Sequence, residues 1–170
     1  MALQATMRKF EIALANADAE IYETIELRVA QHPSENERFL VARVLARVLE
    51  HGEGLEFSKG GVSDDSEPAI TQRNLRGEIT AWIEVGSPSP DRLHKAAKAS
   101  PRVAVYTWKP GLRAAIDERG VHRGDEIAIH EIPQTFLDDV AKTVERTNRW
   151  DISVTGGVIY LTVGDQLFTW

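Results

Sequence analysis

A carboxylate at the end of an apolar segment is the first residue of this sequence that could do chemistry. Glu84 follows ITAWI (79–83) and stands two positions before Gly86. Alternation places Thr80, Trp82 and Glu84 on one face of a strand that is largely apolar on both faces, so we expect this strand to be central. A buried carboxylate is costly unless its charge is compensated. Its partner is a backbone group or an arginine, or else a divalent cation, and the residues alone leave both open.

Further charged residues could complete a metal or phosphate site. Asp64, Asp65 and Glu67 lie close together in a loop, where either Mg²⁺ or water would relieve their mutual repulsion. Glu35 stands near the start of a predicted helix, where the helix dipole by itself favours a negative charge. Lys95, on a later predicted helix, could hold an attacking water or a phosphate oxygen, although a solvated helix face also explains it.

The common catalytic motifs are absent from these 170 residues. The sequence has no Walker-type phosphate loop, no HExxH and no GxSxG, and its five histidines show no ligand spacing. It has no cysteine, which excludes disulfides and thiolate metal sites. The chemistry left to consider is that of carboxylates and lysine.

Alternating residues predict strands at both ends of the chain. Residues 5–14 and 19–30 predict a hairpin with one covered face. Residues 150–170 predict strands joined by glycine turns at 156–157 and 164–165. Aromatic residues concentrate in these last strands, where they either cover the core or form an exposed edge through which the protein oligomerises. They are Trp150, Tyr160, Phe168 and Trp170.

A helix is predicted after the first hairpin. Ser34 and Glu37 have the spacing of a capping box. Apolar residues then recur at helical spacing up to Leu49, which places Arg43, Arg47 and Glu50 on the expected solvent side.

The middle of the chain reads as helix, strand, strand, strand, helix, strand. The strands are expected within 54–61, 68–74, 79–86 and 102–108, with a helix over 88–98. A short helix, a strand and a helix over 134–147 follow. This order predicts an α/β fold with a mixed central sheet and flanking helices.

Bulk properties are those of an ordinary soluble protein. Hydrophobic residues make up 42% of the chain, and its length fits a single domain over 1–170. A formal charge of -6 gives no bulk electrostatic reason to bind nucleic acid, although a local basic groove is compatible with it. No apolar run is long enough to span a membrane and the N-terminus lacks a signal-peptide core, so we expect a cytoplasmic protein.

Several short motifs, in order along nearly the whole chain, resemble those of the YaeQ family of bacterial proteins. HPSE at 32–35 and WIEVG at 82–86 are the most specific. The others are MALQAT (1–6), LEFSKG (55–60), DDSEP (64–68), RLHKA (92–96) and VAVYT (103–107).

The YaeQ family in turn resembles the PD-(D/E)XK nuclease fold, and this implies a PD-(D/E)XK-like core with extra N- and C-terminal strands. The resemblance implies Mg²⁺ held by Glu84 with Glu67 or Asp65. It also implies that Glu35 orients water or metal and that Lys95 supports the water that attacks a phosphodiester. The expected activity is metal-dependent hydrolysis of nucleic acid.

This sequence departs from the pattern of such nucleases at three positions. Gly86 stands where their lysine falls, and Ala69 and Thr80 stand where family members often carry acids. Two hypotheses are therefore kept: an Mg²⁺-dependent nuclease with a degenerate site, and a non-catalytic module that binds nucleic acid or a protein partner through the same cleft.

Overall fold

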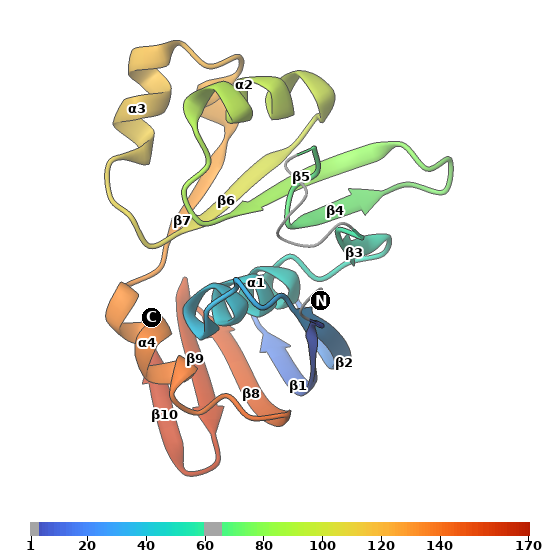
Figure 1. Cartoon of the computed structure of the whole chain (residues 1–170), viewed down its shortest axis with the longest axis vertical. Coiled ribbons are helices and arrows are strands. Elements are labelled where there is room, and N and C mark those ends of the chain that lie inside the picture. Colours follow the sequence, from blue (N-terminus) through green and yellow to red (C-terminus); the bar gives the residue numbers. More distant parts are fainter. Residues whose placement is uncertain (1–3, 60–65) are drawn as a thin grey trace. The chain divides into compact units, whose positions relative to one another are not determined.

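The fold consists of two compact units, each with its own five-stranded sheet (Figure 1). The structure is a computed structural model that describes residues 4–59 and 66–170. Unit 1 contains residues 1–41 and 133–170, and unit 2 contains residues 42–132. The boundary falls within helix α1 (Glu37–Leu49).

The unit 1 sheet brings both ends of the chain together. Its order is β10-β9-β8-β1-β2, and only β1 and β8 are parallel. The strands are β1 (Thr6–Asn16), β2 (Ile21–Gln31), β8 (Thr147–Thr155), β9 (Val158–Val163) and β10 (Gln166–Thr169). Alternate residues of β1 are buried, and the Phe10 ring meets the Trp150 ring edge-on at 4.9 Å between centroids. The predicted hairpin of β1 and β2 is confirmed.

The unit 2 sheet follows chain order, β3-β4-β5-β6-β7, with antiparallel pairing up to β5 and parallel pairing beyond it. The strands are β3 (Leu55–Phe57), β4 (Ile70–Arg73), β5 (Ile79–Val85), β6 (Val103–Thr107) and β7 (Ala128–Glu131). The expectation that residues 79–85 form a central strand is confirmed.

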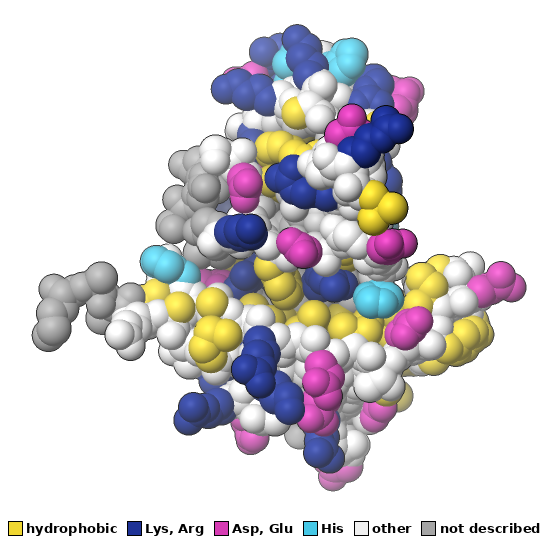
Figure 2. Space-filling model, turned by 90° about the vertical axis from the view of Figure 1, so that its right-hand side faces the viewer, with side chains coloured by type: hydrophobic (Ala, Val, Ile, Leu, Met, Phe, Trp, Pro, Cys, Tyr) yellow, Lys and Arg dark blue, Asp and Glu magenta, His cyan; other side chains and the backbone are white. Residues whose placement is uncertain are grey.

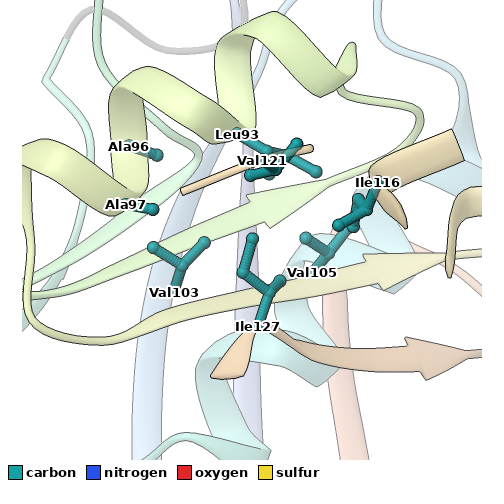
Figure 3. Close-up of a cluster of buried hydrophobic side chains, with 8 residues drawn as sticks. All are labelled: Leu93, Ala96, Ala97, Val103, Val105, Ile116, Val121 and Ile127. Carbon is teal, nitrogen blue, oxygen red and sulfur yellow. The ribbon is translucent and has the colours of Figure 1, made fainter. Parts of the chain in front are cut away.

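Helices α2 (Pro90–Ala99) and α3 (Leu112–Arg119) cover one face of the unit 2 sheet (Figure 1). A short 3-10 turn, η2 (Gly124–Glu126), follows α3. Side chains from α2, β6, α3 and the η2 region point toward one another in a buried apolar cluster (Figure 3). They are Leu93, Ala96, Ala97, Val103, Val105, Ile116, Val121 and Ile127.

Two sheets replace the single central sheet that the sequence predicted. The N- and C-terminal strands pair with one another, through the parallel ladder of β1 and β8, and do not extend the unit 2 sheet. The mixed α/β class itself is confirmed, since each sheet combines parallel and antiparallel pairs. No helix in the ranges 4–59 and 66–170 is long and apolar enough to cross a membrane.

Three local predictions about helices were wrong. Helix α1 begins at Glu37, and its cap is Asn36, whose Oδ1 accepts from the Phe39 N–H at 2.9 Å; the Ser34 hydroxyl contacts the His32 ring instead. A side chain closer to the first turn therefore replaces the expected capping box.

Helix α4 (Gln134–Ala141) ends before Val144. The β-branched pair of Thr143 and Val144 disfavours a further turn, and the Thr143 hydroxyl donates to the Val140 carbonyl at 2.7 Å.

Arg43 and Glu50 are not on a solvent side. Arg43 is buried and its guanidinium lies 5.2 Å from the centre of the Phe57 ring, and the Glu50 side chain is 7% exposed. Both charged side chains have partners outside the helix, which helical periodicity cannot predict.

The C-terminal aromatic residues have different surroundings. Trp150 is buried, and the Trp170 ring lies 6.1 Å from that of Phe136 on α4, whereas Tyr160 is exposed. The first two contribute to the core of unit 1, and oligomerisation through these strands stays a prediction.

Candidate functional site

The end of β5 and the first turn of α2 together place the central carboxylate of unit 2. Glu84 pairs in register with Val105 on β6, so its side chain emerges on the sheet face that α2 covers. Helix α2 begins after Ser89, whose hydroxyl accepts from the Arg92 N–H at 3.2 Å, and Pro90 presets the first turn. The capped turn holds Arg92 over the end of the strand.

Arg92 and Trp82 both donate to Glu84. The Arg92 Nε lies 2.6 Å from Glu84 Oε1, and the Trp82 Nε1 lies 2.7 Å from the same oxygen. Glu84 is only 5% exposed, so these bonds compensate a charge that is removed from water. Arg92 also donates from Nη2 to the backbone carbonyl of Glu67 at 2.8 Å. One guanidinium thus joins the end of β5 to the segment before β4.

The other predicted site residues of unit 2 do not all converge on Glu84. The Glu67 carboxylate is half-exposed and lies 4.0 Å from Arg73 Nη2, so the backbone of Glu67, and not its side chain, reaches the site. Lys95 is exposed on α2, and no contact among the described residues joins it to Glu84. Asp65 lies outside the described residues.

Glu35 belongs to unit 1 and precedes α1 instead of lying in its first turn. It is buried, and its Oε2 accepts from the His32 N–H at 3.2 Å. Its backbone carbonyl accepts from Gln31 Nε2 at 3.0 Å. Glu35 is thus bound to the turn between β2 and α1 through both its carboxylate and its backbone, and this accounts for its burial.

The arrangement around Glu84 does not fit a magnesium ion. Mg²⁺ requires a near-octahedral set of oxygen ligands, whereas two nitrogen donors approach Oε1 of Glu84. The Arg92 guanidinium supplies the positive charge at this point. In the ranges that the structure describes, no three His, Asp or Glu side chains gather as a metal site would require.

A second polar cluster lies on the other face of β6. Tyr106 donates its hydroxyl to Glu50 Oε1 at 2.8 Å, Arg102 pairs with the other carboxylate oxygen, and the His130 ring stacks on Tyr106 at 4.5 Å. Burial and the Glu50 charge raise the pKa of Tyr106, and burial lowers the pKa of His130. Tyr106 therefore stays a protonated donor, and the cluster acts as a fixed hydrogen-bond network.

Sequence reasoning missed parts of both clusters. It recognised an arginine as one alternative partner of Glu84 but assigned the chemical role to Lys95. The capped start of α2 is the local feature that favours Arg92, because a first-turn residue lies nearest the strand end. Glu50 and Tyr106 stand 56 residues apart, and no spacing rule connects them.

The chain is similar to members of one protein family over nearly its whole length. The family model described as "YaeQ protein" matches residues 1–169. The YaeQ protein of Escherichia coli (strain K12) is 31% identical over 167 residues, which cover 95% of this chain and 91% of that protein.

Two crystal structures have the same fold. The YaeQ protein from Pseudomonas syringae superposes with a TM-score of 0.88 at 30% identity, covering 97% of this chain and 92% of that chain. The YaeQ protein from Xanthomonas axonopodis pv. citri also gives 0.88, at 26% identity, covering 97% and 94%.

Proposed function

This chain belongs to the YaeQ family, and on that premise we propose that it is a non-catalytic module that binds nucleic acid and keeps a PD-(D/E)XK nuclease-like unit. Unit 2 runs in the order α1, β3, β4, β5, α2, β6, and this agrees with the helix, three strands, helix and strand of such nucleases. Fold does not fix function, so the site must carry the proposal.

The observation that carries it is the pairing of Arg92 with Glu84. In a nuclease of this kind, the acid on the third strand faces a divalent cation. Here a guanidinium, which cannot activate water, holds that acid at 2.6 Å. The pair compensates the carboxylate without metal, and this supports a module that has lost hydrolysis.

A combined binding and cleavage assay tests the proposal. Labelled single- and double-stranded DNA and RNA are incubated with the protein and Mn²⁺ or Mg²⁺. We expect retarded complexes, intact substrate, and no heat when Mn²⁺ is titrated into the protein. Metal-dependent cleavage that is lost in Glu84→Gln and kept in Glu118→Gln would overturn it. Glu118 is an exposed acid on α3 and serves as the matched control.

Metal-dependent hydrolysis is the second candidate, and one observation favours it. The Glu84 carboxylate and the Glu67 carbonyl converge on the same cationic group, so two oxygens already face one position of positive charge. Removal of the guanidinium separates the two candidates. If Arg92→Ala gains Mn²⁺ binding while the unsubstituted protein shows none, the cation position is shared and the arginine has replaced the metal.

A further inference from the structure

A groove at one end of the unit 1 sheet gathers positive charge, and we infer that it binds the phosphate groups of a nucleic-acid backbone. This inference takes its class of ligand from the proposed function, but it names a site that unit 1 alone builds. The groove has a volume of about 260 Å³. It is lined by Met7, Arg8, Lys9, Arg28, Arg146 and Thr147.

Strand register brings the cations together. Lys9 on β1 stands opposite Arg28 on β2 and beside Thr147 on β8, so the three form a row across neighbouring strands. Phe10 is fully buried, and alternation therefore turns Lys9 to the outer face. The Lys9 N–H donates to the Arg146 carbonyl at 2.8 Å, which fixes Arg146 at the end of the row. Like charges in directly opposite positions repel, and an anion between them would relieve that repulsion.

Nearby acids neutralise only part of this charge. Glu11 lies 3.1 Å from Lys9 but also 3.2 Å from Arg149, and Glu37 lies 4.0 Å from Arg8.

Arg8 also donates from Nε to Gln31 Oε1 at 2.9 Å, which holds its side chain in place. Arg28 and Arg146 are exposed, and neither has an ion-pair partner among the residues that the structure describes. These two cations can meet a phosphate directly, whereas a phosphate reaches Lys9 and Arg8 by displacing Glu11 and Glu37 from them.

The charge of the groove contrasts with that of the rest of the protein. The chain carries a formal charge of -6, and Figure 2 shows Lys and Arg side chains interspersed with Asp and Glu side chains over the face it displays. A groove lined by four cations and no acid is an exception to that pattern. Arginine binds phosphate oxygens in bidentate fashion, lysine adds a point charge, and the Thr147 hydroxyl can donate a further hydrogen bond.

Salt dependence of binding tests the groove. A labelled single-stranded oligonucleotide is titrated with protein between 50 and 200 mM salt, and anisotropy is measured. If four cations contact phosphates, affinity falls about 50-fold over this range, because each contact contributes about 0.7 to the logarithmic slope. Arg28→Ala/Arg146→Ala should bind more weakly at 50 mM salt and lose only about 7-fold over the same range.

Arg76→Ala/Lys98→Ala is the matched control, since both residues are exposed cations of unit 2 and the charge change is equal. It should behave like the unsubstituted protein, and circular dichroism should show both double variants folded. Unchanged binding by Arg28→Ala/Arg146→Ala would show that the groove is not the site of nucleic-acid binding. The proposed function would still stand.

Inorganic pyrophosphate distinguishes a nucleic-acid backbone from a small phosphorylated ligand. If the unsubstituted protein does not bind the oligonucleotide, both the nucleic-acid assignment and the binding half of the proposed function are wrong. If pyrophosphate then gives calorimetric heat that disappears in Arg28→Ala/Arg146→Ala, the groove binds the phosphate groups of a small ligand. If pyrophosphate gives no heat, the inference that the groove binds phosphate is wrong as well.

Discussion

Arginine suits the carboxylate at the end of β5 because its guanidinium is planar, permanently charged and rich in donors. Arg92 uses Nε for Glu84 and Nη2 for the Glu67 carbonyl, so a single side chain satisfies groups from two segments. A lysine could supply the charge but not this fixed fork of donors. The side chain of Arg92 therefore orients as well as neutralises.

Removing this arginine should destabilise unit 2. Arg92→Ala leaves the Glu84 carboxylate buried with Trp82 as its remaining described donor, and we expect the free energy of unfolding to fall by about 1–3 kcal/mol. Lys95→Ala, an exposed change on the same helix, should alter it by less than about 0.5 kcal/mol. Urea unfolding at pH 7 compares the two. Equal values for both variants would mean that the pair contributes nothing to stability.

At the scale of elements, one ion pair ties α4 to the start of α1. Arg38 donates from Nε and Nη2 to the two carboxylate oxygens of Asp138 at 2.6 and 3.0 Å. Hydrogen bonding to Arg38 is the main cause that holds the pKa of Asp138 below its ordinary 3.8. A folded pKa below the unfolded one means that the pair stabilises the ionised protein, and this contribution is lost as the pH falls through the folded pKa.

Asp138→Asn should therefore destabilise the protein at neutral pH and much less in acid. Because the pair is partly exposed, we expect a loss of about 0.5–1 kcal/mol at pH 7, fully present above about pH 4. The difference from the unsubstituted protein should shrink as the pH falls through the depressed pKa of Asp138. Thermal melts at several pH values measure it, with Asp165→Asn in the exposed β9–β10 turn as control. A difference that stays constant with pH would show that packing of α4 is responsible.

At the scale of the whole molecule, the chain folds back so that its two ends share one sheet. β1 pairs with β2 in a local hairpin and with β8 in a parallel ladder from far along the sequence. Such a ladder joins segments far apart in the sequence, and the loop-closure entropy that it costs slows pairing of this kind. Unit 1 is thus discontinuous in sequence, whereas unit 2 is a single segment.

This organisation predicts which amides respond to a core mutation. Phe10→Ala removes a fully buried ring that contacts Trp150 and should cost about 3–5 kcal/mol. Hydrogen exchange should accelerate most in β1, β2 and β8, although β8 lies at the other end of the chain, and less in β5 and β6. Equal acceleration in β5 and β6 would instead show that the two units unfold as one.

The sequence by itself determined the elements and much of their pairing. Alternation in 5–14 and 19–30 specified the hairpin, and apolar residues on both faces of 79–85 specified a central strand. These features are encoded within a few residues of each position, through side-chain periodicity. The boundaries of α1 and α4 were less certain because caps such as Asn36 compete with equally plausible neighbours.

Only the tertiary structure decided how distant segments combine. Whether the terminal strands extend the central sheet or pair with each other depends on long-range packing that local periodicity does not encode. The same holds for the partner of Glu84, since the sequence allowed a backbone group, an arginine or a divalent cation, and the start of α2 selected Arg92. The cations of the unit 1 groove are likewise scattered in sequence and meet only because β2, β1 and β8 are neighbours in register.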